Sequence, residues 1–481
     1  MLGGGYMSDL KACRAALLER FAKQAMGGEP QLQLEDGARV AVVGGGPAGS
    51  MFAYFLLRLA EKIDLQISVD IYEPRHFSHY GPAGCNHCGG IISESLVQLL
   101  AMEGIELPPE VVQRGIDAYE LHTDVGSVRI ETPLHEKRIA GIYRGGGPRG
   151  LTAADWRSFD GYLLELAEKQ GARIRHEMVT DARREGDLPC LSTPFGSESY
   201  DLAVVAAGVN SRLLDKFEAM GMGYQRPKTT AAFISEFHLG EEVIEQQLQS
   251  AMHVFLLNLP RLEFAALIPK KTFVTVCLLG DDIDDELVES FLSAPEVRRC
   301  FPAASSAVRK ASCHCFPRIN IDGAKQPFAE RMIFIGDAGV TRLYKDGIGA
   351  AYRTAKAAAT AAILGGVSEA DLRAHFLPAC RRIAADNAIG KVVFWANNLV
   401  KGFSFTRRAM VRMTAIEQQT PGMSRDMSNA LWDLFTGSAP YREILMRSLN
   451  PRFLGRLLWN AVLALWPAGQ TYRQEEQRES R

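Results

Sequence analysis

The first strong pattern in the chain is an apolar run that stops at a cluster of glycines. Residues 39–43 read Arg-Val-Ala-Val-Val, which is typical of a buried parallel strand. The residues that follow, up to Lys62, have helical spacing, and a second apolar run from Gln66 to Tyr72 predicts another strand. The order strand, glycine turn, helix, strand predicts a βαβ unit at the start of an α/β domain.

The glycines between the first strand and the helix fit the pattern G-x-G-x-x-G. The first allows a tight turn, the second lets the backbone approach a pyrophosphate, and the third lets helix and strand pack closely. The helix N-terminus adds free N–H groups for phosphate, and an acid at the end of the second strand can bind ribose hydroxyls. The predicted dinucleotide-contacting residues of this unit are Gly44, Gly46, Pro47, Ala48, Gly49, Glu73, Pro74 and Arg75.

Farther along, the pattern changes to a succession of short strands. Four runs (residues 231–238, 253–257, 263–269 and 272–279) predict antiparallel strands of an inserted substrate domain. We therefore predict an α/β fold with a Rossmann-like cofactor domain, an inserted antiparallel sheet and a helical C-terminal region. The predicted boundaries are 1–37 for an N-terminal helix and linker, 38–228 and 330–370 for the cofactor domain, 229–329 for the substrate domain, and 371–481 for the helical region. Further substrate-domain strands are expected within 105–150.

Composition narrows the class of protein. The chain of 481 residues has a net charge of −2 and is 47% hydrophobic, so it shows no basic excess that would indicate a nucleic-acid partner. We find no signal peptide and no run of about 18 apolar residues that could span a membrane. Nine cysteines without a secretion signal favour a reducing compartment, so we expect a cytoplasmic location.

Four separated segments resemble the FAD-dependent oxidoreductases of the p-hydroxybenzoate hydroxylase fold. They are Gly44 to Glu73, Asp201 to Ser211, Glu263 to Leu279, and Gly336-Asp337 followed by Gly347-Ile348-Gly349. The resemblance implies that Asp337 holds the ribityl chain of FAD and that the later glycines open a helix toward the flavin pyrimidine. A helix N-terminus there would stabilise the negative charge of reduced flavin. The cofactor contacts implied by these and the neighbouring glycine-rich loops are Gly89, Gly90, Arg144, Ala207, Gly208, Gly336, Asp337, Gly347, Ile348 and Gly349.

Within this fold, the chain is most similar to the geranylgeranyl reductase group. That group places a cysteine followed by glycines after the second strand, as at Cys85, Cys88, Gly89 and Gly90 here. Three departures stand out. Trp156 occupies a position where the family usually has an arginine, so Arg144, Arg149 or Arg157 would have to contact FAD. Ala207 replaces a common acid. Lys345 lies where a proline is usual, and it is either a solvated loop lysine or a cation that steadies reduced flavin.

The clustered cysteines allow several interpretations. Cys85 or Cys88 could lie beside the flavin and position substrate or donate a proton, or the pair could cycle between dithiol and disulfide. Together with Cys313 and Cys315 they could instead bind zinc or an iron–sulfur cluster, or all could be inert. We take Cys85, Cys88 and Lys345 as the candidate catalytic residues and predict no metal.

The segment 450–466 is apolar at most positions and carries Trp459 and Trp466 beside Arg452 and Arg456. It is too short to cross a bilayer, but it suits a helix that lies in the membrane interface. The alternatives are a helix docked on the core or a dimer contact. A peripheral location on the inner membrane face is therefore an open alternative to a purely cytoplasmic one.

We expect an FAD-dependent oxidoreductase that reduces carbon–carbon double bonds of an isoprenoid or lipid-like substrate by hydride transfer from flavin N5. One alternative is a flavin monooxygenase of the same fold, and another is an electron-transfer protein that passes electrons between a carrier and quinone. We expect the electron donor to be either transiently bound NAD(P)H or a carrier protein.

Overall fold

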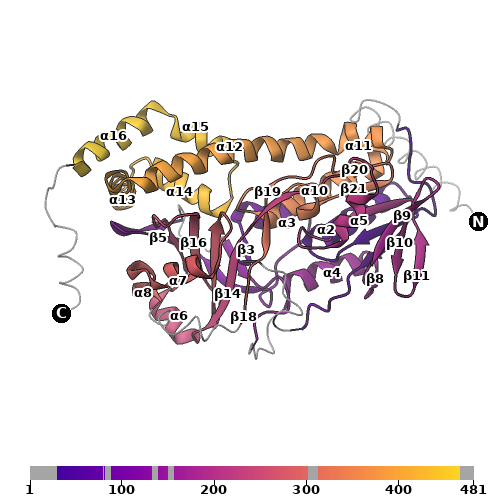
Figure 1. Cartoon of the computed structure of the whole chain (residues 1–481), viewed down its shortest axis with the longest axis horizontal. Coiled ribbons are helices and arrows are strands. Elements are labelled where there is room, and N and C mark those ends of the chain that lie inside the picture. The colour runs from indigo at the N-terminus through magenta and orange to yellow at the C-terminus, as the bar shows by residue number, and fades with distance from the viewer. Residues whose placement is uncertain are drawn as a thin grey trace, which may run out of the picture.

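The computed structural model describes residues 30–79, 81, 88–132, 139–149, 157–301 and 313–465. The expected N-terminal helix within 1–37 and the residues Cys85 and Trp156 lie outside these ranges. The molecule is elongated, with the cofactor domain at one end, a large sheet at the other, and C-terminal helices along one side of both (Figure 1).

The cofactor domain is built on a six-stranded sheet in the order β20-β21-β12-β1-β2-β8. Its strands are β1 (Arg39–Val43), β2 (Ser68–Tyr72), β8 (Arg173–Arg175), β12 (Leu202–Val205), β20 (Phe328–Ala329) and β21 (Met332–Phe334). All neighbours pair in parallel except β20 with β21. Helices α2 (Pro47–Lys62), α4 (Phe159–Lys169) and α10 (Gly347–Thr360) belong to this domain, and α10 ends in a π-helical turn, Ala361–Gly365. Val40 and Val42 have no exposed surface, as the apolar run predicts for a sheet that is covered on both faces.

A seven-stranded sheet forms the other end of the molecule, in the order β18-β14-β17-β16-β15-β5-β6. Its strands are β5 (Ala118–Thr123), β6 (Gly126–Glu131), β14 (Phe233–His238), β15 (Ala251–Phe255), β16 (Leu262–Pro269), β17 (Phe273–Gly280) and β18 (Cys313–Cys315). The pairing is antiparallel except between β15 and β5, which run parallel. The four runs that predict antiparallel strands pair antiparallel with one another, as β14, β15, β16 and β17. The parallel partner β5 comes from an earlier segment of the chain, for which the sequence indicates no direction of pairing.

The two faces of this sheet are covered by different layers. Along β16, Phe264, Ala266 and Ile268 belong to one apolar cluster with residues of the C-terminal helices. Ala265 and Leu267 belong to a second cluster with helices α6 (Glu241–Gln247), α7 (Asp285–Ser293) and α8 (Pro295–Cys300). This alternation follows from the two-residue period of a strand, and it separates anything bound on one face from anything bound on the other.

In the part of the chain that the structure describes, three smaller sheets accompany the two large ones, and one of them, β9 to β11, packs on the cofactor-domain sheet. They contain β3 (Ile91–Ile92), β4 (Val112–Ile116) and β7 (Ile139–Ile142), then β9 (Asp181–Glu185), β10 (Leu188–Thr193) and β11 (Gly196–Ser199), and β13 (Lys228–Ala231) with β19 (Arg318–Asp322). Two short helices, α3 (Glu94–Met102) and α5 (Leu213–Ala219), complete this part.

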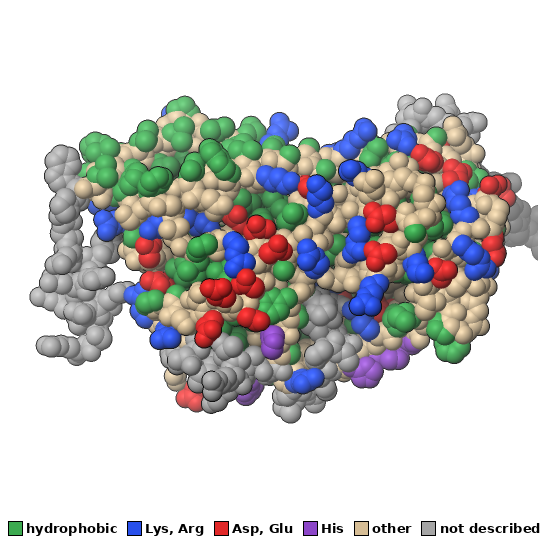
Figure 2. All heavy atoms as spheres, viewed as in Figure 1, with side chains coloured by type: hydrophobic (Ala, Val, Ile, Leu, Met, Phe, Trp, Pro, Cys, Tyr) green, Lys and Arg blue, Asp and Glu red, His purple; other side chains and the backbone are tan. Residues whose placement is uncertain are grey.

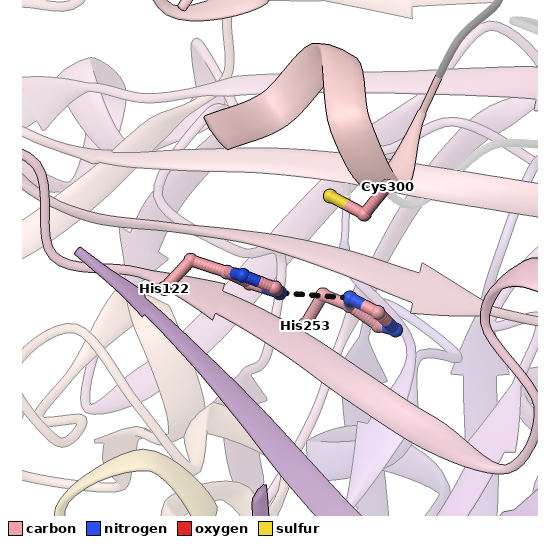
Figure 3. Close-up of side chains that lie close together, drawn as sticks. All are labelled: His122, His253 and Cys300. Carbon is pink, nitrogen blue, oxygen red and sulfur yellow. Dashed lines mark hydrogen bonds between the residues drawn. The ribbon is translucent and has the colours of Figure 1, made fainter. Parts of the chain in front are cut away.

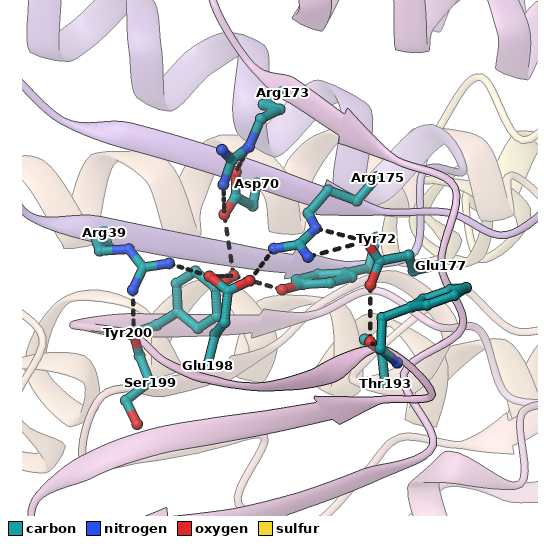
Figure 4. Close-up of polar contacts among 11 residues, drawn as sticks. Arg39, Asp70, Tyr72, Arg173, Arg175, Glu177, Thr193, Glu198, Ser199 and Tyr200 are labelled. Carbon is teal, nitrogen blue, oxygen red and sulfur yellow. Dashed lines mark hydrogen bonds and ion pairs between the residues drawn. The ribbon is translucent and has the colours of Figure 1, made fainter.

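A polar network fixes the β9–β11 sheet to the main sheet (Figure 4). Buried Asp70 on β2 accepts hydrogen bonds from Arg173 at 2.6 and 2.7 Å and from the Tyr200 hydroxyl at 3.0 Å. Arg175 pairs with Glu177 and with Glu198 on β11. Burying an acid at this junction is tolerated because each of its oxygens accepts a hydrogen bond.

The C-terminal region consists of α11 (Glu369–His375), α12 (Leu377–Gly402), α13 (Ser404–Gln419), α14 (Asp426–Thr436), α15 (Tyr441–Ser448) and α16 (Pro451–Leu465). Helix α12 has 26 residues and runs along the molecule from the cofactor domain to the large sheet (Figure 1). Among the described residues, no helix is long and apolar enough to cross a membrane.

Candidate functional site

A pocket of about 340 Å³ lies where the cofactor domain, the large sheet and helix α14 meet. It brings together segments that are far apart in the chain: the turn after β1, the loop after β2, the turn after β12, the turn after β21 and the start of α10. The predicted cofactor residues that line it are Gly44, Gly46, Pro47, Ala48, Arg75, Gly89, Gly90, Arg144, Ala207, Gly208, Gly336, Asp337, Gly347 and Ile348.

The glycine turn after β1 is shaped by close backbone approaches. Gly44 has φ +107°, and a Cβ atom placed on it would lie 2.5 Å from the carbonyl oxygen of Ala206. A Cβ on Gly49 would lie 1.9 Å from the carbonyl oxygen of Gly44. Gly49 is not among the lining residues, and its place is the contact between α2 and the turn. This is the packing role expected of the third glycine.

Two helix N-termini open into the pocket. Neither α2 nor α10 has an acidic residue in its first turn, and the residues that begin them line the pocket. The N-cap of α10 is Asp346, in a left-handed conformation with φ +52°, and its side chain accepts a hydrogen bond from the Gly349 amide at 3.2 Å. Gly349 is thus committed to the cap and does not line the pocket. The N-terminus of α2 thus suits an anionic group of a ligand, whereas the N-terminus of α10 already holds the Asp346 carboxylate, which pairs with Arg342 and Arg353.

Glu73 takes part in building the loop. Its side chain is buried, and its two oxygens accept hydrogen bonds from the Gly45 amide, the Arg75 amide and the Arg75 guanidinium at 2.9–3.1 Å. Glu73 and the exposed Pro74 are not lining residues, whereas Arg75 is. The acid therefore holds the glycine turn and Arg75 in place beside the pocket.

Of the three arginines considered in place of Trp156, Arg144 lines the pocket. Its guanidinium forms a two-pronged pair with Asp160, at 3.1 Å from Nε to Oδ1 and 3.0 Å from Nη2 to Oδ2. Asp160 is fully buried, so the pair fixes the orientation of the arginine. Arg157, by contrast, pairs with Glu165 on the surface, and Arg149 lies against Gly81.

The turn after β21 carries the acid Asp337, which lies beside Asn320 of β19. Burial raises the pKa of Asp337, and the positive charge of Arg144 opposes that change. Asn320 donates from Nδ2 to the Asp337 carbonyl oxygen at 3.0 Å. Its Oδ1 is buried and has no hydrogen-bond partner among the described residues. Since buried polar atoms are nearly always paired, this oxygen suits a donor group on a ligand.

Two of the cysteines that the structure describes, Cys88 and Cys277, line the pocket. Cys88 lines the pocket, and its sulfur accepts a hydrogen bond from the Gly90 amide at 3.4 Å, whereas Cys85 lies outside the described residues. Cys277 on β17 also lines the pocket, and burial raises the pKa of its thiol to about 12. The sequence analysis missed Cys277. The signal was its place in the β17 alternation, two residues before Leu279, which also faces the pocket.

Lys345 lines the pocket and is 8% exposed, so the interpretation as a solvated loop lysine is wrong. Its ammonium donates to the Asp433 carbonyl oxygen at 2.8 Å and lies 4.2 Å from the centre of the Tyr441 ring. Burial lowers its pKa well below the usual value. Helices α14 and α15 bury it, and local sequence carries no sign of their approach.

The part of the pocket that borders the large sheet is mostly apolar, while Arg318, Arg342 and Thr341 add polar groups elsewhere in the lining. One wall comes from the large sheet and is closed by Phe435 of α14; the lining residues are Ile234, Met252, Phe264, Ala266, Ile268, Leu279 and Phe435. A glycine-lined end with helix dipoles and cations thus continues into a chamber suited to a hydrocarbon group.

Comparisons with known proteins agree with this architecture. No protein-family model matches the chain. A curated relative, geranylgeranyl diphosphate reductase of Synechocystis, is 25% identical over 234 residues, which cover 43% of this chain and 50% of that protein. The match thus spans about half the length of the relative.

Solved structures match over most of the chain. A flavin-dependent brominase has a TM-score of 0.54 at 15% identity and covers 92% of this chain and 99% of its own. A 2-methyl-3-hydroxypyridine-5-carboxylic acid oxygenase has a TM-score of 0.53 at 16% identity, covering 79% and 95%. The protein CtdE, solved in complex with FAD and a substrate, has a TM-score of 0.53 at 13% identity, covering 89% and 100%.

The expected fold class is confirmed, and the described residues of the pocket fit FAD. The unpaired Asn320 Oδ1, the glycine turns and the N-terminus of α2 offer what a flavin and a pyrophosphate require. The chain has the fold of FAD-dependent flavoproteins, with a sequence similar to geranylgeranyl diphosphate reductase.

Proposed function

We propose that the protein is an FAD-dependent oxidoreductase that reduces carbon–carbon double bonds of an isoprenoid or lipid-like substrate. The observation that carries the proposal is the continuity of the pocket. The same cavity is lined by the glycine turns at Gly44 and Gly347 and by the apolar side chains of Phe264, Ile268 and Phe435. The partial similarity to geranylgeranyl diphosphate reductase supports the choice of substrate class.

FAD, when bound, would supply a hydride. The protein itself would position the substrate double bond, exclude water and deliver a proton. An alkene is a weak hydride acceptor, so a dry and shaped chamber contributes much of the rate. The wall formed by Ile234, Ala266 and Ile268 would hold the double bond against the glycine-lined end.

Within this proposal, two side chains have chemical roles at the junction of the two ends. Cys88 is the candidate to donate the proton from its sulfur to the second alkene carbon, since it lines the pocket between Gly89 and the sheet. Lys345 is the candidate to meet the negative charge that would build up on the cofactor. Burial lowers its pKa, whereas a negative charge beside it would favour its protonated form. The start of α10 would act with it, because the helix dipole has the same sign.

An exposed apolar face on the C-terminal helices supports a lipid substrate. Figure 2 shows hydrophobic side chains gathered over this part of the molecule. The large exposed apolar side chains there are Val392, Trp395 and Leu399 of α12, Phe403, Met446 of α15, Leu449, and Leu454, Leu458, Trp459, Val462 and Leu465 of α16. We propose that this apolar face rests on a membrane surface. The expected contact of 450–466 thus extends to α12 and α15.

Charge is consistent with an anionic membrane. Residues 377–465 contain 12 Lys and Arg against 5 Asp and Glu, a net charge of +7, while the whole chain has −2. Trp and Arg are favoured at the boundary between headgroups and acyl chains. Helix α14 contributes Phe435 and Thr436 to the pocket, so the same helical layer borders both the apolar face and the site.

Identification of retained ligands tests the substrate class. Protein purified under mild conditions is extracted and analysed by mass spectrometry, and we expect FAD together with an apolar chain-bearing molecule. In Ala266→Trp the indole would fill the apolar chamber, so the chain-bearing molecule should disappear while FAD remains. Ala266→Val is the conservative control and should retain both. Equal retention of the apolar molecule by Ala266→Trp would contradict its placement in the pocket.

A monooxygenase is the second candidate, because an oxygenase and a brominase share the fold. The two reactions differ in the fate of dioxygen. A monooxygenase would transfer one atom of labelled dioxygen into the product, whereas a reductase turns over without dioxygen.

A further inference from the structure

Two histidines and a cysteine lie close together at the large sheet (Figure 3). His122 belongs to β5, His253 to β15, and Cys300 is the last residue of α8. The His122 Nε2 and His253 Nδ1 atoms are 2.9 Å apart, and one ligand atom from each of the three residues lies within 4.8 Å of the others. These are the atoms that bind transition metals in proteins.

The two imidazoles are held for such a role. His122 Nδ1 shares a hydrogen bond of 2.8 Å with the Ser127 hydroxyl, and its ring stacks on Phe255 at 4.7 Å between centres. His253 has a backbone hydrogen bond with Leu248. Outer contacts of this kind fix the ring orientation of metal-binding histidines and leave the inner nitrogens for the ion.

Burial keeps both rings uncharged. His122 and His253 are 8% and 6% exposed, and this desolvation lowers the pKa of His122 to about 3 and that of His253 to about 4. The neutral ring is the form that binds metal. Arg299 and Arg129 add positive charge near the two rings. Burial raises the pKa of the Cys300 thiol to about 12, and Glu120 adds a smaller effect in the same direction, so zinc would have to displace the thiol proton.

We propose that His122, His253 and Cys300 form a zinc site. Two imidazole nitrogens bound to one zinc ion at about 2.0–2.1 Å lie about 3.3 Å apart in a tetrahedron. The two nitrogens are 2.9 Å apart in the structure, so they would have to move apart by only a few tenths of an ångström to bind one ion. The mixed nitrogen and sulfur set selects zinc over magnesium or calcium, and a water molecule would complete the coordination.

Zinc binding would release one proton from the protein and move another within it. The Cys300 thiol donates hydrogen bonds to the carbonyls of Glu296 and Val297, and it would release its proton to solvent as the zinc–sulfur bond forms. The proton shared by the two rings would move to an outer nitrogen. His122 Nδ1–H then donates to Ser127, while His253 keeps its proton toward Leu248. No oxidation or reduction occurs.

The position of the site indicates a structural role. Met252 lines the pocket, and His253, the next residue of β15, points to the other face. An ion held by β5, β15 and α8 would fasten the α7–α8 layer to the sheet without touching the pocket. It would stabilise this part of the fold, since an ion that binds only the folded state shifts the folding equilibrium.

The test uses the full-length, FAD-loaded protein freed of metal and titrated with Co²⁺, then with Zn²⁺. We expect one Co²⁺ per chain with a thiolate-to-cobalt absorption band, displacement by Zn²⁺, and a zinc-dependent rise in melting temperature. His253→Asn and Cys300→Ser should each weaken binding at least about tenfold, as even the loss of an outer contact costs 10–100-fold. Cys380→Ser, which removes a buried thiol of α12, is the matched control and should bind like the parent.

The absorption spectrum of the flavin is a second readout of the zinc titration. It should not change when Zn²⁺ binds, because the sheet lies between the site and the pocket. Circular dichroism of each metal-free variant checks that it folds, and a folded His253→Asn variant must lack the zinc-dependent rise. Cobalt binding unchanged in both ligand variants, or no cobalt binding by the parent protein, would overturn the proposal.

Discussion

Replacing Arg144 by methionine separates its two expected functions, which are neutralising Asp160 and binding the cofactor. Asp160 is fully buried, while the Arg144 side chain keeps 19% of its surface exposed toward the pocket. Removing the cation leaves a buried carboxylate without its charge partner, which costs about 3–5 kcal/mol in comparable cases. We therefore expect Arg144→Met to lower the free energy of unfolding by about that amount in urea titrations of the FAD-free protein.

Cofactor affinity gives the second magnitude. A charge-assisted hydrogen bond contributes about 1.5–3 kcal/mol, so loss of the Arg144 contact should raise the Kd for FAD by about 10–150-fold. Asp160→Asn is the matched control, because it keeps the cation at the pocket and removes only its partner. It should raise the Kd by less than about tenfold. Flavin fluorescence during titration measures both values.

The double variant Arg144→Met/Asp160→Asn completes the cycle. It should recover part of the lost stability, because no charge is left buried, but it should not recover FAD affinity. Equal Kd values for Arg144→Met and Asp160→Asn would refute the reasoning, since the arginine would then act only through the fold.

Three further predictions follow from other parts of the structure. Gly49→Ala should abolish FAD binding or folding, because its Cβ would meet the Gly44 carbonyl oxygen at 1.9 Å, whereas Gly402→Ala, with no atom within 4 Å, should be neutral in the same titration. The double variant Trp395→Glu/Trp459→Glu should sediment less with anionic lipid vesicles than the parent protein does. Met102→Glu changes an exposed apolar residue of α3 outside the apolar face and is the control, which should sediment like the parent. Unchanged sedimentation of the double variant would argue against a membrane contact of the apolar face. Because the folded-state pKa values of His122 and His253 are about 3 and about 4, the unfolded chain takes up protons first, and stability should fall as pH drops below about 6.5 by up to about 1.4 kcal/mol per histidine per pH unit. In a His122→Asn/His253→Asn variant, the free energy of unfolding measured in urea titrations should fall less steeply with decreasing pH. The same dependence on pH in the variant and the parent would show that these two histidines do not cause it.

The parts of the fold that the sequence predicts are those with local signals. The glycine turn at Gly44 and the N-terminal glycines of α10 are short patterns whose chemistry depends on near neighbours in the chain. The strands at 263–269 and 272–279 were likewise indicated by their own alternation, and the structure has them at β16 and β17. The βαβ order then sets which strand ends meet.

What the sequence does not predict depends on long-range packing. The parallel pairing of β5 with β15 joins segments more than 120 residues apart in the chain. The two-residue alternation of a strand does not indicate whether its neighbour in the sheet runs parallel or antiparallel to it. The burial of Lys345 depends on α14 and α15, whose sequence indicates only that they are helical. The sequence does not indicate that His122 and His253 lie side by side, because no local pattern shows that their strands are neighbours. Each of these cases concerns which surface a residue meets, which is decided by tertiary structure.

The most direct test of the account is an anaerobic single turnover. The FAD-loaded protein is reduced with dithionite, the excess reductant is removed, and a geranylgeranyl-chain lipid is added without dioxygen. We predict that flavin absorbance returns as the lipid gains two hydrogen atoms for each reduced double bond, measured by mass spectrometry, and that Cys88→Ser slows this step more than Cys190→Ser does. Flavin that stays reduced until dioxygen is admitted, with oxygen then appearing in the lipid, would contradict the reductase and establish a monooxygenase.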